Sequence, residues 1–422
     1  MKIIHLSNSD ISGGAARAAY RLHKALQESG IDSQMFVRTK KSDDWTVLST
    51  LSNTKKLFNL LRPTLGKKLS QLQHSDNINL RSVNWLPSSW SKEINSSDID
   101  IVNIHWVGSE TLSIEDIGQI KKPIVWTMHD MWPFCGAEHY TNDDQKARWL
   151  TGYKKNNRLP HESKIDIDRL TWERKKKAWK NTNMHIISPS QWLADCAKQS
   201  VLFQNNHIST IPNPLDTNVY QPIDKNFCKR MLKLPIDKNI ILFGAIGGGN
   251  DPRKGYDLLK KALFQLRNLI DPNSVECVIF GQSEPKSPIE LPFNTHWLGH
   301  INDDITLALI YNTATLMVVP SRAENLPQTA TEAQSCGIPV VCFATTGLLD
   351  TVDHEKTGYL VKPFDTMELA SSMAQILNDS QKQLYLSKGA REKALSSWRK
   401  DIIIEHYNDI YQSILSKNSS IK

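Results

Sequence analysis

Short apolar runs rich in β-branched residues recur along the chain, and stretches with apolar residues at helical spacing separate them. The runs are continuous rather than alternating, which is typical of parallel strands covered on both faces. Strands that alternate with helices in this way predict an α/β fold with doubly wound sheets. The predicted strands have the sequences MKIIHLS, DSQMFVR, DIVNIHW, KPIVWTMHD, MHIISPS, ISTIPN, NIILFGAIG, VECVIFGQ, TLMVVPS and IPVVCFAT.

The predicted strands fall into two series, one that ends near Ile211 and one that starts near Ile240. The segment between the series is rich in Pro, Asn and Asp, and we interpret it as a linker that leads into a second domain. We therefore expect two Rossmann-like domains, at 1–215 and 216–397. The tail has the pattern of successive helices, and the last, at about 398–416, is expected to pack back on the first domain.

A polar, basic insertion runs from about Tyr140 to Asp168. It has no strand pattern and is longer than an ordinary connection between two elements. We expect it to form a loop-rich lobe beside the cleft of the first domain, because functional loops gather at such places.

The composition favours a globular protein and limits the cellular locations and the classes of partner to be expected. Of 422 residues, 40% are hydrophobic, and no apolar run approaches the roughly 20 residues of a membrane span. The N-terminus lacks the apolar core of a secretory signal, and the six cysteines lack metal-binding spacing. We therefore expect a cytoplasmic protein with free thiols. The net charge of +7 suits an anionic partner, but without a nucleic-acid-binding motif we expect no nucleic acid.

Two glutamates, Glu324 and Glu332, lie between two predicted strands in PSRAENLPQTATEAQSCGIPVVCF, residues 320–343. The stretch predicts a strand, a turn with Glu324, a helix with Glu332 that ends at Gly337, and the next strand. Ligands of such sheets bind beyond the carboxyl ends of the strands. The two carboxylates can accept hydrogen bonds from sugar or ribose hydroxyls there, and the amides of the turn favour phosphate. Either glutamate taken alone would be an ordinary surface residue.

A glycine-rich loop leaves another predicted strand in ILFGAIGGGNDPRKGYDLL, residues 241–259. The glycines let the backbone approach a ligand closely, and Arg253 and Lys254 can neutralise a leaving diphosphate. The loop has neither the ending of a Walker loop nor GxGxxG spacing, so the prediction depends on its basic ending.

Further candidates lie in the first domain. Gly13 and Gly14 follow the first predicted strand and precede an amphipathic helix. The amides of such a turn can face a phosphate, although an ordinary tight turn has the same pattern. His129 and Asp130 follow another predicted strand, where a histidine can bond a sugar hydroxyl or a phosphate oxygen. The alternative is a loop histidine with structural partners, and the same choice applies to His105 at the end of a third strand.

Residues 54–72, TKKLFNLLRPTLGKKLSQL, combine five basic with seven apolar side chains. A basic amphipathic segment can lie on an anionic membrane surface, where each Lys or Arg adds about 1 kcal/mol. Pro63 and Gly66 are expected to break the helix. Two short helices packed on the core are the alternative to a membrane contact.

Taken together, the motifs resemble those of the family 4 glycosyltransferases with the GT-B fold. The resemblance rests on the Gly13–Gly14 turn, TMHD, IPNPLD, PRKG and ENLPQTATEAQSCGIPVV in this order, and it spans nearly the whole chain. HDMWPFCGAEHY further resembles a branch of bacterial polysaccharide and O-antigen assembly enzymes. The family implies two domains that face a central cleft. It also implies sugar transfer from a UDP- or GDP-linked donor, with retention of configuration and with no metal or other cofactor.

The resemblance also assigns roles to individual residues. The residues it implies for donor binding are Gly13, Gly14, Arg253, Lys254, Glu324, Asn325, Leu326 and Glu332. Among them Glu332 would hold the ribose, Glu324 the sugar hydroxyls, and Lys254 with Arg253 the diphosphate. The residues it implies for catalysis are His129, Lys254 and Glu324, with His129 near the reacting centre. No carboxylate stands out as a covalent nucleophile, so the acceptor hydroxyl is expected to attack from the front face.

The expected acceptor is a saccharide or lipid-linked saccharide in the synthesis of O-antigen, capsule or exopolysaccharide. The expected location is the cytoplasm, with contact to the inner face of the cytoplasmic membrane. Two alternatives stay open at this point: a GT-B sugar-nucleotide epimerase, and a non-catalytic nucleotide-sugar-binding scaffold of a polysaccharide assembly complex.

Overall fold

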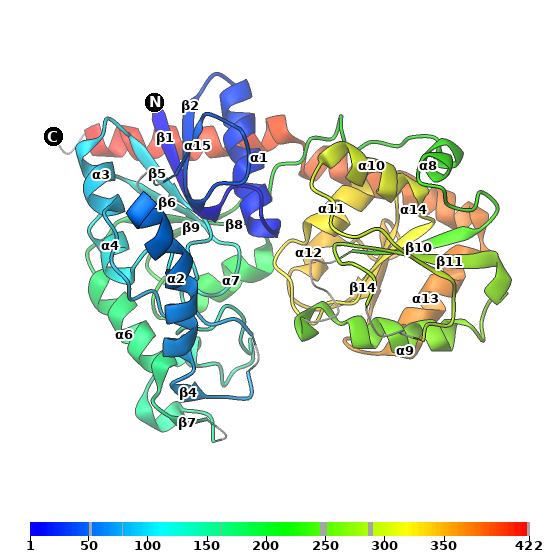
Figure 1. Cartoon of the computed structure of the whole chain (residues 1–422), viewed down its shortest axis with the longest axis horizontal. Coiled ribbons are helices and arrows are strands. Elements are labelled where there is room, and N and C mark those ends of the chain that lie inside the picture. The colour runs from blue at the N-terminus through cyan, green and yellow to red at the C-terminus, as the bar shows by residue number, and fades with distance from the viewer. Residues whose placement is uncertain (50–52, 78, 161, 245–250, 286–289, 420–422) are drawn as a thin grey trace. The chain divides into compact units, whose positions relative to one another are not determined.

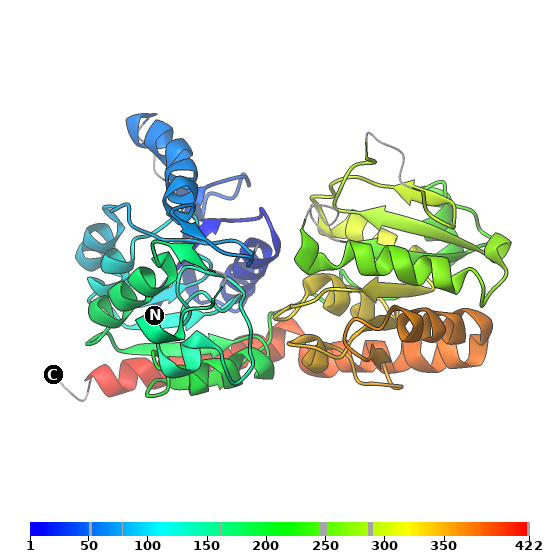
Figure 2. The ribbon, with the colours of Figure 1, turned by 90° about the horizontal axis from the view of Figure 1, so that it is seen from below.

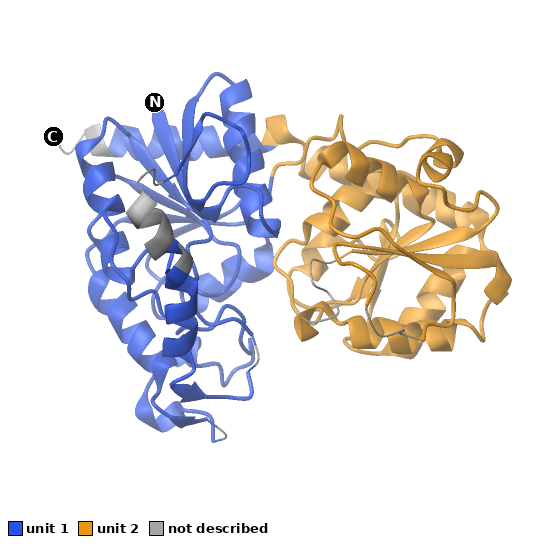
Figure 3. Cartoon of the chain, viewed as in Figure 1, with its two compact units in different colours: residues 1–213, 403–422 blue, residues 214–402 orange. Residues whose placement is uncertain are grey.

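The computed structural model describes residues 1–49, 53–77, 79–160, 162–244, 251–285 and 290–419. The chain divides into two compact units, which Figure 3 shows in different colours. Unit 1 contains residues 1–213 and 403–422, and unit 2 contains residues 214–402. The sequence placed the boundary after residue 215 and the returning helix at about 398–416.

Unit 1 is built on a parallel sheet that has seven strands in the described residues, in the order β3-β2-β1-β5-β6-β8-β9 (Figure 1). The strand order turns back at β1, which pairs with both β2 and β5, so the sheet is doubly wound. The strands are β1 (Lys2–Ser9), β2 (Asp32–Thr39), β3 (Val47–Ser49), β5 (Ile101–Ile104), β6 (Ile124–Thr127), β8 (Met184–Ser188) and β9 (His207–Thr210).

The unit 1 sheet is buried on both faces because successive side chains point into two different hydrophobic layers. Leu6 and Ile104 contribute to one layer, and Ile3 and Ile101 contribute to the other. The second layer includes Tyr407 of the last helix, which runs along the sheet in both views (Figures 1 and 2). The helices of this unit are α1 (Gly14–Glu28), α2 (Asn53–Ser70), α3 (Trp90–Ser96), α4 (Ile114–Gly118), α5 (Arg148–Thr151), η1 (Lys155–Asn157), α6 (Ile167–Ala178), α7 (Gln191–Gln199) and α15 (Lys400–Ser419).

Polar contacts, in addition to the apolar ones, hold α15 on the sheet. Asn103 Nδ2 of β5 donates to the hydroxyl of Tyr411 at 2.8 Å. The hydroxyls of Thr127 and Tyr407 lie 3.1 Å apart, and Thr127 Oγ1 also donates to Asn103 Oδ1 at 3.1 Å. Because these groups are buried, each of them needs its partner, and the contacts define one position for the helix along the strands.

The helix α2 differs from what the sequence predicted. It is one continuous helix, whereas the sequence predicted a break at Pro63 and Gly66. Arg62 is buried beside the proline, and its Nε donates to the carbonyl oxygen of Glu110 at 2.7 Å. A Cβ at Gly66 would lie 2.6 Å from Glu110 Cγ, so glycine permits the helix to approach this close. Tertiary contacts on both sides of the proline therefore keep the helix continuous.

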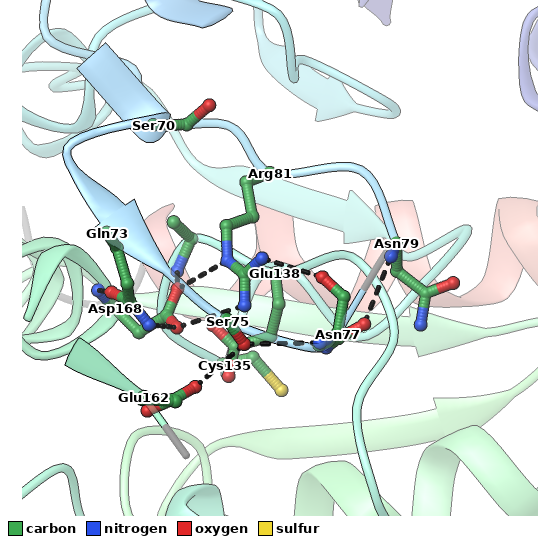
Figure 4. Close-up of polar contacts among 12 residues, drawn as sticks. Ser70, Gln73, Ser75, Asn77, Asn79, Arg81, Cys135, Glu138, Glu162 and Asp168 are labelled. Carbon is green, nitrogen blue, oxygen red and sulfur yellow. Dashed lines mark hydrogen bonds and ion pairs between the residues drawn. The ribbon is translucent and has the colours of Figure 1, made fainter. Parts of the chain in front are cut away.

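The segment after α2 is tied to the start of α6 by the polar contacts that Figure 4 shows. Asp168 accepts a hydrogen bond from Gln73 Nε2 at 2.6 Å and lies 3.4 Å from Arg81 Nε. The neighbouring Glu138 is buried, and burial together with Asp168 raises its pKa well above the usual range. The shift favours a proton on Glu138, because two buried carboxylates close together repel each other.

The region from Tyr140 to Asp168 contains more structure than the sequence predicted. It includes α5 and a strand, β7 (Ser163–Lys164), that pairs antiparallel with β4 (Gln73–His74). The expectation of no strand was therefore wrong, because a strand of two residues is too short to show a periodic pattern.

Unit 2 is also built on a doubly wound parallel sheet. Over the part of the unit that the structure describes, the strand order is β12-β11-β10-β13-β14-β15. The strands are β10 (Asn239–Gly244), β11 (Val275–Phe280), β12 (Thr295–Trp297), β13 (Leu316–Val319), β14 (Val340–Phe343) and β15 (Gly358–Val361). The helices are α8 (Lys225–Met231), η2 (Pro252–Lys254), α9 (Tyr256–Leu266), η3 (Pro272–Ser274), α10 (Asp304–Thr313), α11 (Gln328–Ser335), α12 (Leu348–Thr351), α13 (Thr366–Asn378) and α14 (Ser380–Ser397).

The strand order of unit 2 turns back at β10, which pairs with both β11 and β13. Alternate side chains again enter two hydrophobic layers, with Leu242 and Met317 in one and Ile241 and Val318 in the other. In sheets of this type, ligands bind beyond the carboxyl ends of the strands next to the turning point. The strands β10 and β13 of unit 2 and the strands β1 and β5 of unit 1 are therefore the places to look for a site.

We expect Tyr411→Phe to lower the urea midpoint of unfolding, because it leaves the buried Asn103 amide without an acceptor. An unsatisfied buried donor costs about 1–3 kcal/mol. Tyr385→Phe is the matched control, since the Tyr385 side chain is 63% exposed. Equal midpoints for the two variants would contradict the importance of the Asn103–Tyr411 hydrogen bond.

Candidate functional site

Glu324 lies in the loop between β13 and α11, beyond the carboxyl end of a central strand of unit 2. Its backbone N–H donates to Thr346 Oγ1 at 3.0 Å, and its carbonyl oxygen accepts from the Gly347 N–H at 2.9 Å. A Cβ at Gly347 would lie 1.5 Å from the Asn325 carbonyl oxygen, so only glycine lets the loop after β14 come this close. Two neighbouring loops therefore fix the backbone that presents Glu324.

Two cations hold the Glu324 carboxylate. Lys254 Nζ donates to Glu324 Oε1 at 2.6 Å, and Arg253 Nη1 lies 3.2 Å from Oε2. Ser321 Oγ donates to Oε1 at 2.9 Å. Burial alone would raise the pKa of Glu324, but Lys254 and Arg253 lower this pKa to about 2. The carboxylate is therefore ionised at physiological pH, and we call these four residues the Glu324 cluster.

The cations reach Glu324 because the turn η2 docks against the end of β13. The Asp251 carboxylate caps the turn by accepting the Arg253 N–H at 3.0 Å. The Arg322 N–H donates to the Arg253 carbonyl oxygen at 2.7 Å, which joins the two loops through their backbones. Gly255 has φ 68°, and a Cβ there would lie 1.9 Å from the Pro320 carbonyl oxygen. The glycine of the PRKG motif is thus required by both the backbone conformation and the close approach.

The predicted convergence of Lys254 and Glu324 is present in the structure, as a direct ion pair. The Lys254 side chain is 23% exposed and, among the described residues, gives one hydrogen bond, to Glu324, so its ammonium keeps donors for a ligand. The glycine-rich loop before the turn was also predicted to approach a ligand. Its residues 245–250 lie outside the described part of the chain.

The other predicted donor-binding residues of unit 2 are also near the end of β13. Asn325 and Leu326 follow Glu324 in the same loop, and both are buried. Glu332 lies in α11 and is buried, and its Oε2 accepts a hydrogen bond from the Tyr311 hydroxyl of α10 at 2.7 Å. Burial and then Glu332 raise the pKa of Tyr311 well above its usual range, so the tyrosine stays a donor.

The predicted glycine turn of unit 1 connects β1 to α1. Gly13 has φ 95°, a conformation that favours glycine, and a Cβ there would meet nothing within 4 Å. The helix begins at Gly14, and its first turn contains no acidic residue. The start of a helix carries partial positive charge, so this turn is compatible with an anion.

His129 lies two residues after β6, and its ring is part of a chain of histidines. Its Nε2 lies 3.1 Å from His105 Nδ1, and His105 Nε2 lies 2.9 Å from His5 Nδ1 in β1. Burial lowers the pKa of His129 to about 4, although Asp130 acts in the opposite direction. His129 is thus a neutral ring at the carboxyl end of a central strand, with His105 as its structural partner.

Asp130 has a structural role in the loop that follows β6. Its Oδ2 is 2.6 Å from His139 Nδ1 and accepts from the Trp106 indole at 2.8 Å. His139 Nε2 lies 2.7 Å from Ser82 Oγ. This Ser-His-Asp geometry resembles that of a nucleophilic triad. However, Ser82 is buried and its Oγ accepts the Ser109 N–H at 2.8 Å, so these contacts hold loops together rather than expose a nucleophile.

Several residues of the site were missed by the sequence-based reasoning. Thr346 and Gly347 follow the strand VVCF, and the rule that ligands gather at the carboxyl ends of strands could have found them. Tyr311 lies inside an apolar helix, where no pattern marks it. His5 lies inside a buried strand and looks like an ordinary strand residue.

Comparison with known families supports the predicted fold. Residues 12–219 match the family model described as Glycosyltransferase Family 4, and residues 224–393 match the one described as Glycosyl transferases group 1. HepE of Anabaena, solved in complex with UDP-glucose, superposes with a TM-score of 0.64 over 100% of both chains, at 16% identity. The chain therefore has the GT-B fold. The predicted fold class is confirmed, and each half of this GT-B chain matches a glycosyltransferase family model.

Curated relatives of the GT-B chain include enzymes of two kinds. D-inositol 3-phosphate glycosyltransferase of Saccharomonospora viridis is 29% identical over 224 residues, which are 48% of this chain and 50% of the relative. The capsular polysaccharide biosynthesis glycosyltransferase CapM of Staphylococcus aureus is 26% identical over 125 residues, which are 30% and 32% of the two chains. The GT-B chain thus spans half the length of the first relative and a third of the second.

We expect Glu324→Gln to remove a pH-dependent part of the stability. The folded pKa of about 2 is depressed from 4.5, so this stabilisation is complete above the unfolded pKa and is lost as the pH falls towards 2. The shift corresponds to on the order of 3 kcal/mol at neutral pH. Urea unfolding between about pH 2 and pH 7 should show this loss in the unchanged protein and not in the variant.

The matched control for Glu324→Gln is Glu115→Gln. Glu115 forms a 2.6 Å ion pair with Arg174, but its side chain is 48% exposed. This variant should keep the acid-dependent loss. An identical pH profile for Glu324→Gln and the unchanged protein would contradict the depressed pKa.

Proposed function

We propose that the protein is a retaining glycosyltransferase that moves a sugar from a nucleotide diphospho-sugar, UDP- or GDP-linked, to a saccharide or lipid-linked saccharide. The observation that carries this proposal is the Glu324 cluster at the turning point of the unit 2 sheet. It combines a carboxylate for sugar hydroxyls with two cations for a diphosphate. The two family matches and the UDP-glucose complex of the similar HepE support the donor class.

In the proposed reaction, the cations of the Glu324 cluster stabilise the leaving nucleoside diphosphate. Departure of the diphosphate builds negative charge, and preorganised donors lower the free energy of that state without a metal. Lys254 has donors left after its bond to Glu324, and Arg253 is fixed beside it. We assign Glu324, with Asn325 and Leu326, to the sugar and Glu332 to the ribose.

Residues of unit 1 complete the proposed set. Gly13 and Gly14 are assigned to the phosphates, because α1 starts at Gly14 and the start of a helix carries partial positive charge. His129 is assigned to the donor sugar near the reacting carbon. We infer that the acceptor hydroxyl attacks from the front face and that the leaving phosphate takes its proton. The expected pathway is cell-surface polysaccharide synthesis, in line with the capsular relative CapM.

The proposal is tested by incubating the protein with UDP-, GDP-, ADP- and dTDP-sugars, first in a thermal-shift assay and then with saccharide acceptors. Binding of the correct donor raises the melting temperature by mass action. Product analysis by NMR should show a new glycosidic bond with the anomeric configuration of the donor. A donor that changes only to its epimer would indicate an epimerase, and donor binding without any chemistry would indicate a scaffold protein.

Lys254→Ala should lower kcat/KM by about 10²-fold or more, because loss of one preorganised donor to a developing anion has effects of this size. Lys261→Ala is the matched control, since Lys261 is an exposed lysine on the helix that follows the same turn. Both variants should unfold as cooperatively as the unchanged protein. Full transfer activity of Lys254→Ala would contradict the assigned role.

We also infer that α2 contacts an anionic membrane surface. Leu61 and Leu65, one helical turn apart, are 52% and 40% exposed, and Lys67 and Lys68 are exposed in the last turn. The side chains of Lys55 and Lys56 lie outside the described part. In the residues that the structure describes, none of the helices is long and apolar enough to cross a bilayer.

Lys67→Glu with Lys68→Glu should weaken binding to phosphatidylglycerol vesicles by about 30-fold or more, because each lysine lost near the surface removes about 1 kcal/mol and each new carboxylate is repelled. Lys176→Glu with Lys177→Glu on α6 introduces the same charge change at two other exposed lysines of unit 1. Cosedimentation with the vesicles measures both. If the control variant loses binding equally, the attraction comes from the net charge and not from α2.

A further inference from the structure

Three histidines form a chain through the interior of unit 1, of which only His129 belongs to the proposed site. They come from three adjacent strands in the sheet order: His5 lies in β1, His105 directly follows β5, and His129 follows β6. The ring nitrogens are 2.9 Å apart in the first contact and 3.1 Å apart in the second. His5 and His105 are buried, and His129 is half-buried. The chain thus leads from the core to the carboxyl end of β6.

The three rings are neutral. Burial lowers the pKa of His129 to about 4, and it lowers the pKa values of His5 and His105 well below the usual range. Neighbouring imidazoles lower the latter two further, because His23 faces His5 and both His5 and His129 face His105. The carboxylate of Asp130 is the group that favours a charged His129, and its effect is smaller than that of burial.

Neutrality makes the two contacts depend on each other. A neutral imidazole has one N–H donor and one lone pair. His105 uses both of its nitrogens in the chain, so it must donate at one of them and accept at the other. The two hydrogen bonds therefore run in the same direction. Either all three rings carry the proton on Nδ1, or all three carry it on Nε2.

The ends of the chain distinguish the two arrangements. His5 Nε2 is buried and has no hydrogen-bond partner among the described residues. A proton on this nitrogen would leave a buried N–H without a protein acceptor, which is less favourable than a buried lone pair. At the other end of the histidine chain, the hydrogen bond of His129 among the described residues uses its Nε2 and leaves Nδ1 out. A proton on Nδ1 of the half-buried His129 can instead be donated to a ligand.

We propose that His5 and His105 are positioning residues that hold His129 with its proton on Nδ1, so that the ring offers a hydrogen-bond donor at the carboxyl end of β6. The use of this donor rests on the proposed function: it bonds an oxygen of the transferred sugar or of the leaving diphosphate. With Nδ1 already protonated, the ring does not take the proton of the acceptor hydroxyl. This is consistent with the leaving phosphate as the base.

NMR can identify the tautomer of each histidine in the whole 422-residue chain without any donor sugar. Histidine labelled with ¹⁵N gives two-bond ¹H–¹⁵N correlations whose pattern differs between the two neutral tautomers. We expect His5, His105 and His129 all to show the proton on Nδ1. A proton on Nε2 of His129, or a mixed pattern along the chain, overturns the inference.

Two variants of His105 distinguish an effect on the position of the His129 proton from a general effect on folding. His105→Glu replaces the donor to His129 Nε2 with a carboxylate that only accepts, so His129 should carry a proton on Nε2. His105→Gln keeps an amide that can donate, and should keep the His129 tautomer. His185→Leu is the control. His185 lies in the adjacent strand β8, is not one of the three linked histidines, and has its Nε2 2.9 Å from Ser209 Oγ. Thermal melts confirm that each variant is folded.

Kinetics give the second measurement. His105→Glu should lower kcat by about tenfold with little change in the KM of the donor sugar, and His105→Gln should keep most of the kcat. Absence of a proton on His129 Nε2 in His105→Glu overturns the inference.

The NMR result and the transfer assay separate the inference from the proposed function. If the unchanged protein transfers no sugar but all three rings carry the proton on Nδ1, the proposed function fails and the positioning stands. If it transfers sugar but His129 carries the proton on Nε2, the positioning fails and the proposed function stands.

Discussion

A parallel sheet covered on both faces leaves few places for charged side chains, and the carboxyl ends of its strands are the main one. Both units of this chain are such sheets, with buried apolar residues on either side of every central strand. Polar residues therefore gather where the strands end and the loops begin. In unit 2 this place holds Glu324 with Lys254 and Arg253, and in unit 1 it holds His129 and the turn at Gly13.

The two units meet the cost of burying polar groups in different ways. Unit 2 keeps the charge of Glu324 and provides cations for it, which lowers its pKa to about 2. Unit 1 also contains buried groups whose pKa shifts favour the neutral form: burial lowers the pKa values of His5, His105 and His129, and burial with Asp168 raises the pKa of Glu138. An ionised cluster suits the binding of a charged diphosphate, whereas neutral rings suit directional hydrogen bonds.

The sequence predicted those features of the fold and of the site that depend on periodicity and on motifs. The continuous apolar strands predicted doubly wound α/β sheets, and the resemblance of the motifs to family 4 glycosyltransferases implied the GT-B fold. The PRKG and Glu324 motifs placed Lys254 and Glu324 at neighbouring strand ends. It did not predict their ion pair, because pairing depends on how the turn η2 docks through Gly255. It missed the continuity of α2, which depends on Arg62 contacts with residues far along the chain. It also missed the short strands β3, β12 and β15, which have only three or four residues.

The last helix has a consequence for how the protein is made. Most of α15 belongs to unit 1, although it follows the whole of unit 2 in the chain. During synthesis, unit 2 can complete its sheet from one uninterrupted stretch while unit 1 still exposes the apolar face that α15 will cover. Ribosome-bound chains should therefore carry a folded unit 2 and an incompletely covered unit 1, which is a natural target for chaperones until α15 emerges.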